Sequence, residues 1–285
     1  MTCEELMTLF NEHISELPYA NPSENGTSYG GWISNLKTRN KNSNPNQTMK
    51  LDINQENDLF LLFVLASCWS RTGKYESSAY FVVYLKDQRK NDPEYWKTLA
   101  NFVREKKASK QTSEFIKNNY VQFSNRTISI NENFFDSTYG VAKYWEDIKA
   151  KIELAKTTND WKGFMDYLHS LKGLAGGAGF NYDGTYRPGK NKNGKETDPK
   201  MIIKIPLILR EMRVALPSSY GCIPGKYCCI PDKRVRDAVK NNISDLDLGN
   251  ATSYDTLIEQ SSAIYQKFGD WYDIPLFAYE DLRLL

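Results

Sequence analysis

The sequence predicts an all-α fold with one fused core, arranged as two helical lobes. About ten segments carry apolar residues at the spacing of a buried helix face, whereas strand patterns are almost absent. Several segments also begin with a helix-start signature, such as Asp92-Pro93-Glu94, where an acid precedes a proline in the first turn. No repeat is visible at a fixed period. A cleft between two helical lobes would be a natural ligand site.

The first half of the chain is expected to alternate helices with polar loops. Residues 2–17 place Leu6, Phe10 and Ile14 on one helix face, and the Gly-, Ser-, Asn- and Lys-rich segment 23–50 then reads as a loop or flexible arm. Residues 55–70 are apolar almost all round, which indicates a buried helix, and Gly73 ends it. Further helices are predicted at 78–87, 93–106 and 112–120, with a loop or short hairpin at 121–133.

The second half is expected to contain helices on both sides of one polar loop. The predicted helices cover residues 137–155, 160–171, 200–214, 232–242, 254–268 and 273–285. Between 171 and 200 lies a glycine-rich turn, followed by a loop rich in Gly, Lys and Asn. We therefore expect residues 1–50 to form an N-terminal helix and loop, and 51–285 to form a helical domain with its hairpin near 171–200.

The composition is that of a soluble globular protein, with 40% hydrophobic and 25% charged residues. The net charge is only +2, so any nucleic-acid-binding surface must be local. No stretch has the length and apolarity of a membrane span, and the acidic N-terminus carries no signal sequence. We therefore expect a cytoplasmic monomer that does not bind a membrane. Cys222, Cys228 and Cys229 lack the paired spacing of a zinc site, so we expect no metal and no cofactor.

The stretch from Leu171 to Val239 contains most of the candidate functional residues. A glycine-rich turn between helices can leave backbone N–H groups free to bind a phosphate, and nearby lysines add positive charge. On this argument, the candidate DNA-binding residues are Gly176, Gly177, Gly179, Lys190, Lys192 and Lys195. The pattern is weak alone, because most glycine-rich loops are only loops.

Two residues in this stretch could perform chemistry at a sugar carbon. Lys200 follows Asp-Pro at an expected helix start, where the positive end of the helix dipole and partial burial would favour a neutral, nucleophilic amine. Asp232 follows a proline at the start of another helix, where a carboxylate could stabilise an oxocarbenium-like sugar or activate an attacking group. Taken alone, a solvent-exposed lysine and an ordinary N-cap aspartate are the commoner readings.

These residues resemble a known family. Lys200 and Asp232 lie 32 positions apart (232 − 200), and Asp232 stands in the sequence Ile-Pro-Asp-Lys-Arg-Val. This arrangement resembles the archaeal 8-oxoguanine DNA glycosylases of the helix-hairpin-helix superfamily. Further similar segments, in an order that spans residues 55–285, are Arg71-Thr72-Gly73-Lys74, Tyr80-Phe81 and Ile274-Pro275-Leu276. The resemblance implies two helical lobes with double-stranded DNA across their cleft and a base flipped into a pocket. It also implies that Lys200 is the nucleophile and Asp232 its electrostatic and proton-handling partner.

The sequence departs from this family where the base is expected to bind. Aromatic residues that sandwich the base are replaced here by small, aliphatic or charged ones, and the acid near the last helix has two candidates. The corresponding substrate-binding positions are Ala79, which follows Ser78, and Lys204, Glu280, Asp281 and Leu284. Such a pocket would have more room and more polarity than one for oxidised guanine, which suggests a bulky or polar base, such as the sugar-decorated cytosine of some phage genomes.

The first interpretation is therefore a DNA glycosylase that removes a modified base and leaves an abasic site, with or without strand cleavage through Lys200. An anti-phage role would follow from a phage-specific base. An 8-oxoguanine glycosylase in base excision repair is the alternative within the family. Two alternatives come from other classes: a nucleic-acid-binding module without chemistry, and a hydrolase of free nucleotides or nucleosides.

Overall fold

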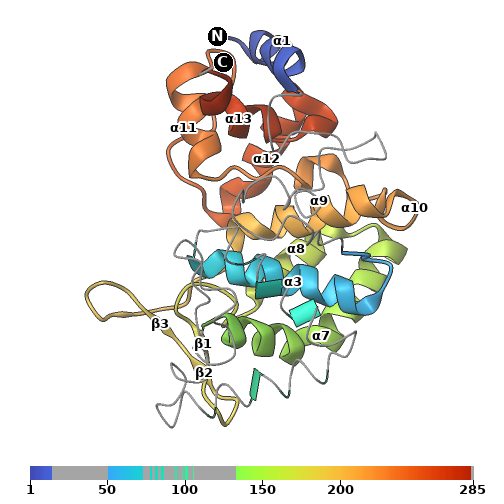
Figure 1. Ribbon diagram of the computed structural model, residues 1–285, viewed down its shortest axis with the longest axis vertical. Coiled ribbons are helices and arrows are strands. Elements are labelled where there is room, and N and C mark those ends of the chain that lie inside the picture. The colour runs from blue at the N-terminus through green and yellow to red at the C-terminus, as the bar shows by residue number, and fades with distance from the viewer. Residues whose placement is uncertain are drawn as a thin grey trace. The chain divides into compact units, whose positions relative to one another are not determined.

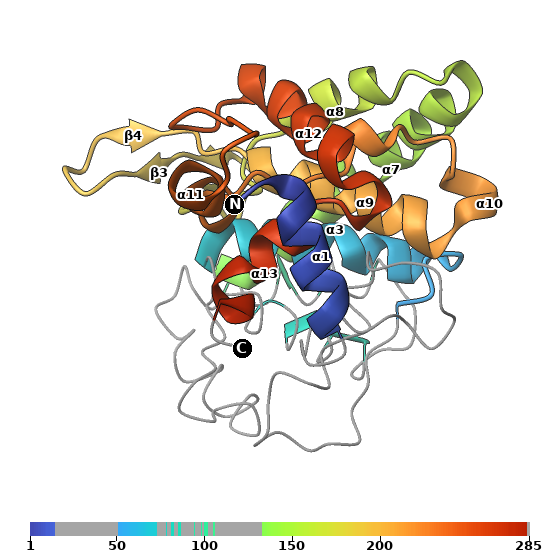
Figure 2. The same ribbon diagram turned by 90° about the horizontal axis from the view of Figure 1, so that it is seen from above.

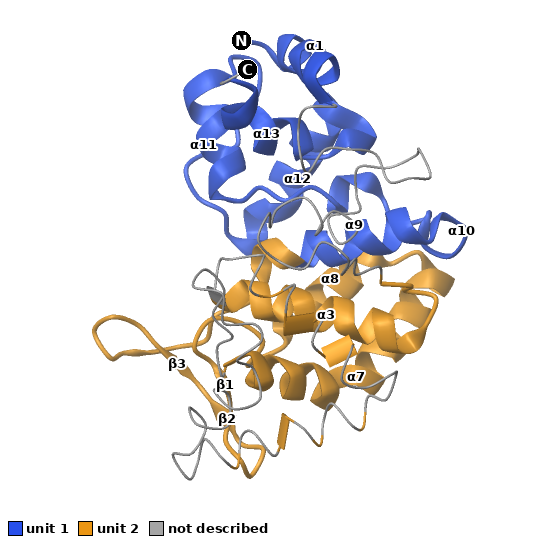
Figure 3. Cartoon of the chain, in the orientation of Figure 1, with its two compact units in different colours: residues 1–50, 205–285 blue, residues 51–204 orange. Residues whose placement is uncertain are grey.

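The chain forms two compact, mostly helical units. The computed structural model describes residues 1–14, 51–72 and 133–283, together with single residues between 78 and 105 (Figure 1). Unit 1 comprises Met1–Lys50 and Ile205–Leu285, and unit 2 comprises Leu51–Lys204 (Figure 3). The predicted all-α class is therefore confirmed in its coarse sense.

Unit 2 is built on two long helices that pack against each other. The apolar sequence of α3 lets it present buried side chains on every face, and the rings of Phe60 and Phe63 meet the edge of Trp145 from α7 at centroid distances of 5.3 and 5.8 Å. The elements of unit 2 are α3 (Glu56–Thr72), α7 (Asn133–Thr158), α8 (Trp161–Ser170), β1 (Gly179–Phe180), β2 (Tyr186–Arg187), β3 (Gly189–Lys190), β4 (Glu196–Thr197) and η3 (Ile202–Lys204).

Unit 1 brings the N-terminal helix together with helices from the end of the chain. Helix α1 packs against α13 and α12, and its N-cap Thr2 forms a capping box with Glu5. Ser253 caps α12 in the same way. The elements of unit 1 are α1 (Cys3–His13), α9 (Ile205–Ala215), α10 (Pro217–Tyr220), η4 (Gly225–Tyr227), α11 (Lys233–Asn242), α12 (Tyr254–Phe268), η5 (Gly269–Trp271) and α13 (Ile274–Leu282).

The predicted helices within the described residues are confirmed, but two of them start elsewhere: α7 begins at Asn133, four residues before the predicted start, and α9 begins later than predicted. The predictions at 2–17, 55–70, 137–155, 160–171, 232–242, 254–268 and 273–285 correspond to α1, α3, α7, α8, α11, α12 and α13. The helix predicted at 200–214 begins later, because a 3₁₀ turn covers 202–204 and α9 starts at Ile205. The short helix α10 was missed. The elements predicted at 78–87 and 93–106 fall mostly outside the described residues, and those at 23–50, 112–120 and 121–132 fall wholly outside them.

The segment after the glycine turn is not the polar loop that was predicted, because it forms two antiparallel β-hairpins. Strands β1 and β2 are joined through Asp183-Gly184, and β3 and β4 through Asn193-Gly194. Asp-Gly and Asn-Gly are strong hairpin signals, since the glycine adopts a positive φ without cost. Gly184 and Gly194 have φ angles of 83° and 76°. The hydrophobic periodicity used to find elements could not detect strands that carry so few apolar residues.

Candidate functional site

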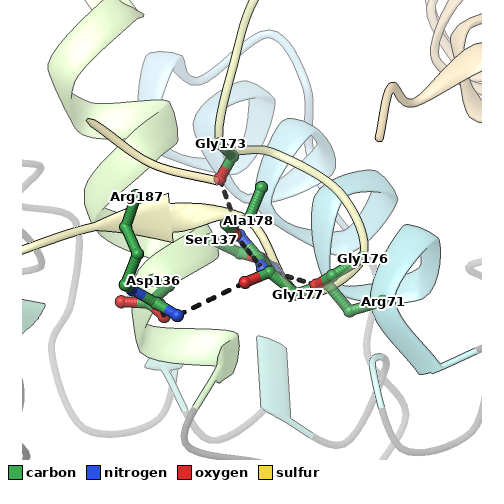
Figure 4. Close-up of polar contacts among 8 residues, drawn as sticks. All are labelled: Arg71, Asp136, Ser137, Gly173, Gly176, Gly177, Ala178 and Arg187. Atoms are coloured by element: carbon green, nitrogen blue, oxygen red, sulfur yellow. Dashed lines mark hydrogen bonds and ion pairs between the residues drawn. The ribbon is translucent and has the colours of Figure 1, made fainter. Parts of the chain in front are cut away.

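The glycine turn after α8 is fixed by a partly buried arginine. Arg71 extends from the last turn of α3 and donates to the carbonyl oxygens of Gly176 at 2.8 Å, Ala178 at 2.6 Å and Gly173 at 2.7 Å (Figure 4). Its Nε also donates to the hydroxyl of Ser137. One guanidinium group thus satisfies three carbonyl groups of a turn that has no regular backbone ladder. This explains why Arg-Thr-Gly follows the buried helix: the arginine holds the turn in place.

Only one of the three candidate phosphate-binding glycines remains accessible. The N–H of Gly176 donates to the carbonyl of Ser70 at 3.2 Å, so it is already used. Gly179 is buried in β1, where a Cβ would lie 3.0 Å from the carboxylate of Asp136. The expectation of a free N–H group is therefore wrong for Gly176, whereas close packing is enough to explain the glycine at 179. Gly177 is exposed and stays a candidate.

A second arginine joins the same turn to α7. Arg187 of β2 pairs with the carboxylate of Asp136 at 2.6 Å and donates to the carbonyl of Gly177 at 3.3 Å (Figure 4). Asp136 is only 1% exposed, so this ion pair lies mostly out of contact with water. The turn and the first hairpin are thereby tied to both long helices of unit 2. Arg71, Arg187 and Asp136 are not predicted as a set, because no spacing rule connects them.

Lys200 lies just before η3, not at the start of an α-helix. Its ammonium group is 3.1 Å from the carboxylate of Asp198 and donates to the carbonyl of Ser170 at 3.3 Å. Its side chain is 19% exposed. Lys200 is therefore not at the positive end of a helix dipole, where the sequence predicts it, because α9 begins five residues later (205 − 200).

Asp198 is the centre of a small cluster around Lys200. Tyr186 donates its hydroxyl to this carboxylate at 2.6 Å, and the ammonium group of Lys172 lies 3.8 Å away. Burial disfavours the charged form, but the hydrogen bonds from Tyr186 and Lys200 outweigh it and hold the pKa of Asp198 below its ordinary value. Burial and the bond to Asp198 raise the pKa of Tyr186. Two lysines therefore share one ionised carboxylate, and Lys200 has a local counter-ion.

Asp232 is the N-cap of α11, as the sequence predicts for an ordinary aspartate at this place. Its Oδ1 accepts from the N–H of Val235 at 3.0 Å, and no described residue donates to its Oδ2. The side chain is partly exposed. The carboxylate thus has one oxygen committed to the helix and one available for another partner.

The loop before Asp232 is held by a buried ion pair. The carboxylate of Asp273, which directly precedes α13, accepts from the N–H of Ile230 at 2.8 Å and from Arg210 of α9 at 2.7 Å. Both charged side chains are buried, at 0% exposure for Arg210 and 2% for Asp273. Burial opposes the charge of Arg210, but Asp273 and Glu211 outweigh it and raise the pKa of the guanidinium group.

The next carbonyl along this loop is also fixed. The carbonyl of Pro231 accepts from Arg236 at 2.7 Å and from the hydroxyl of Thr252 at 3.0 Å. The single hydrogen of that hydroxyl is shared with Oε1 of Gln260, also 3.0 Å away. The backbone before Asp232 is therefore bonded by Arg236 of α11, by Thr252 and by Asp273 at the start of α13. Such a fully bonded loop holds a side chain in one place.

Lys200 belongs to unit 2 and Asp232 to unit 1, so their predicted convergence on one pocket stays a prediction. The same holds for the substrate-binding positions that the structure describes. Lys204 is buried in unit 2, with its ammonium group 3.5 Å from the ring centre of Trp69. In unit 1, Glu280 is exposed and pairs with Arg283 at 3.2 Å.

Asp281, the other acid candidate, pairs with Arg234 of α11 at 2.6 Å. The guanidinium group of Arg234 also lies 4.2 Å from the ring centre of Phe277. Within unit 1, α11 and α13 are thus joined close to the N-cap aspartate. Ala79 and Leu284 lie outside the described residues.

No protein-family model, curated protein or solved structure matches this chain. Among the described residues, no group of His, Cys, Asp and Glu side chains could hold a metal ion. No described helix has the length and hydropathy that crossing a membrane requires.

Proposed function

We propose that the protein is a DNA glycosylase that hydrolyses the N-glycosidic bond of a flipped-out modified base. The observation that carries this proposal is the state of Asp232: its loop is bonded at successive backbone groups, and Oδ2 has no donor among the described residues. A fixed, partly exposed carboxylate is what a reaction through an oxocarbenium-like sugar requires. The similarity of its surroundings to the 8-oxoguanine glycosylases supports the choice of substrate class.

In this mechanism, the carboxylate of Asp232 faces the sugar of the extruded nucleotide. The bond between C1′ and the base nitrogen breaks, and its electron pair leaves with the base, which then takes a proton. A water oxygen bonds to C1′ and its proton passes to Asp232. An abasic site remains. Asp232 stabilises the positive charge that develops on the sugar during this step.

Lys200 is the alternative route to the same product. An amine attack on C1′ would give a Schiff base and, in a second step, strand cleavage. The Nζ of Lys200 is already bonded to Asp198 and to the carbonyl of Ser170, so we propose hydrolysis by water as the principal route. Trapping with borohydride decides between them: a covalent protein–DNA adduct that disappears in Lys200→Ala would establish the lyase route.

The proposed substrate is a duplex with a bulky or polar modified base. Lys204, Glu280 and Asp281 are charged at positions where the family places aromatic or acidic residues, and such a pocket suits a sugar-decorated hydroxymethylcytosine of phage DNA. A defence role would follow. The alternative substrate is 8-oxoguanine, with a role in repair.

The test compares base release from three duplexes of one sequence, containing cytosine, glucosylated hydroxymethylcytosine or 8-oxoguanine. We expect abasic sites from the glucosylated duplex, and a rate at least about 100-fold lower for Asp232→Asn, since general-base and electrostatic contributions are of this size. Equal or faster release of 8-oxoguanine would overturn the choice of base. Binding to the duplexes without release of any base would support the nucleic-acid-binding module. Release of bases only from free nucleosides would support the nucleoside hydrolase.

A further inference from the structure

The two hairpins of unit 2 are copies of one structure, ten residues apart. In the first, the N–H of Asn181 donates to Thr185 at 2.8 Å and the N–H of Gly184 donates to Asn181 at 2.9 Å. In the second, Asn191, Lys195 and Gly194 repeat both bonds at 2.9 Å. The strand register is also the same: Gly179↔Arg187 and Phe180↔Tyr186 in the first, Gly189↔Thr197 and Lys190↔Glu196 in the second. This is a short internal repeat, which corrects the expectation that none exists.

The first copy packs on the helices of its unit. Phe180 is 3% exposed, and its ring lies 5.6 Å from that of Tyr139 on α7. The ammonium group of Lys143 lies 4.6 Å from the same ring and donates to the carbonyl of Gly184 at 3.0 Å. The structural role of the first hairpin is therefore accounted for by its aromatic residue.

The second copy has no such role. Lys190 takes the place of Phe180, every residue from 190 to 198 is exposed, and the hairpin projects away from the helices of unit 2 (Figures 1 and 2). A two-stranded hairpin without a packed face is marginally stable. Apart from the buried Gly189 at its base and the contacts of Asp198, it contributes no side chain to the core, so its lysines are available to a partner. Three of its positions carry lysine: 190, 192 and 195.

The tip of the first copy presents an aromatic ring to solvent. Tyr182 is 55% exposed, and among the described residues only Met1 and Leu154 are other large apolar side chains with comparable exposure. The second copy makes the same turn with Lys192 at the corresponding position, so the turn itself does not require an aromatic residue. The ring of Tyr182 is thus unexplained by packing or by turn geometry, and an exposed ring can stack on a base.

We infer that the tandem hairpins are a two-part DNA-binding element. The lysines of the second hairpin neutralise backbone phosphates, and Tyr182 of the first stacks on an unpaired base. The choice of DNA as partner rests on the proposed function, because both features would suit RNA equally. The element acts in binding and not in bond cleavage. It predicts tighter binding to DNA that has an unpaired base than to an intact duplex, since a stacked base offers no free face.

The test uses DNA that contains no modified base, so that binding is measured without turnover. The probes are one 20-mer as an intact duplex, as a duplex with an abasic site, and as a single strand. For Tyr182→Ala, we expect binding to the single strand and to the abasic duplex to weaken by about 5- to 150-fold, and binding to the intact duplex to stay the same. Tyr182→Phe should bind as the natural protein does. Leu154→Ala removes another exposed apolar side chain and is the matched control.

Removing the lysines should affect DNA binding differently from removing the tyrosine ring. The double change Lys192→Ala and Lys195→Ala should weaken binding to all three probes and reduce the slope of log K against log salt by about 2, since each phosphate contact contributes nearly one unit. Tyr182→Lys reproduces the residue that the second copy carries at this position, so it should fold. It should retain affinity for the intact duplex and lose the preference for unpaired DNA.

Each failure has its own meaning. Unchanged binding of Tyr182→Ala to the single strand, or an unchanged salt slope in the double lysine variant, would overturn this inference even if the protein releases bases. If the natural protein binds all three probes as described but releases no base from any duplex, the proposed function fails and this inference stands. If it binds none of them at 50 mM salt, this inference is wrong.

Discussion

The buried pair of Arg210 and Asp273 allows a sharp prediction, because its carboxylate has two tasks. It neutralises Arg210 at 2.7 Å and accepts the N–H of Ile230 at 2.8 Å. Asp273→Ala removes both partners at once. Loss of one member of a buried ion pair costs about 3–5 kcal/mol, because the other charge stays buried. We therefore expect the free energy of unfolding to fall by about that amount.

The double variant Arg210→Met and Asp273→Leu separates the two tasks. It removes both charges and fills their volume with apolar atoms, a replacement that is often neutral or stabilising in buried pairs. The N–H of Ile230 then lacks its acceptor, which costs about 1–3 kcal/mol, and the buried Glu211 loses a neighbouring positive charge. We expect the double variant to be more stable than Asp273→Ala alone, by about 2 kcal/mol on these figures, but to have a loosened loop before Asp232.

Two measurements check this reasoning. Urea unfolding followed by circular dichroism gives the free energies, and amide hydrogen exchange gives the protection of the Ile230 N–H. That protection should fall at least about tenfold in the double variant, whereas Asp273→Asn keeps an acceptor oxygen and should retain most of it. The half-exposed pair Lys162 and Asp166 on α8 is the control, and Asp166→Ala should cost less than about 1 kcal/mol. A loss below about 1 kcal/mol for Asp273→Ala, or a double variant no more stable than it, would refute the reasoning.

Two further predictions concern titratable groups. Five cysteines are free and only Cys222 is exposed, while burial raises the pKa of Cys68 and Cys228 to about 12; one thiol should react rapidly with a disulfide reagent at pH 8, and five should react in urea. Hydrogen bonds, first from Lys267, lower the pKa of Asp245 to about 2, so its contribution to stability is complete above pH 4 and is lost as the pH falls towards 2. Asp245→Asn should abolish that part of the acid sensitivity, and the change in the free energy of unfolding should be no more than about 1 kcal/mol for so exposed a pair. Acid unfolding curves of the natural protein and of Asp245→Asn that coincide would contradict this prediction.

The sequence predicted helices well because their signals are local. Each apolar stripe and each cap lies within one short segment, so α1, α11 and α12 could be located from spacing and from residues such as Thr2, Asp232 and Ser253. The hairpins failed for the opposite reason. Their strands are two residues long and mostly polar, so the turn glycines are the only sequence signal for the hairpins. Glycines alone are equally typical of an irregular loop.

The contacts that build the candidate site are long-range, and the sequence could not reveal them. Arg71 reaches a turn about 100 residues later, at Gly173, and Arg210 meets Asp273 across 63 residues. In the sequence, an arginine at a helix end and an acid before a helix that starts with Ile-Pro each have an ordinary local explanation. Only packing decides that these groups are buried, and burial turns an ordinary charge into one that must be paired. The same holds for Lys200: its neighbour Asp198 is evident in the sequence, but the late start of α9 could not be predicted from it.

The N-cap geometry of Asp232 supports the ordinary interpretation and the catalytic one together. A cap needs one oxygen, and Oδ1 supplies it to Val235 at 3.0 Å; chemistry at a sugar needs the negative charge and the second oxygen. Asn is about as good an N-cap as Asp, so Asp232→Asn should leave the free energy of unfolding within about 0.5 kcal/mol. The same change removes the charge, and turnover should fall at least about 100-fold. If stability and turnover fell together, or if neither changed, the carboxylate would be a helix cap and nothing more.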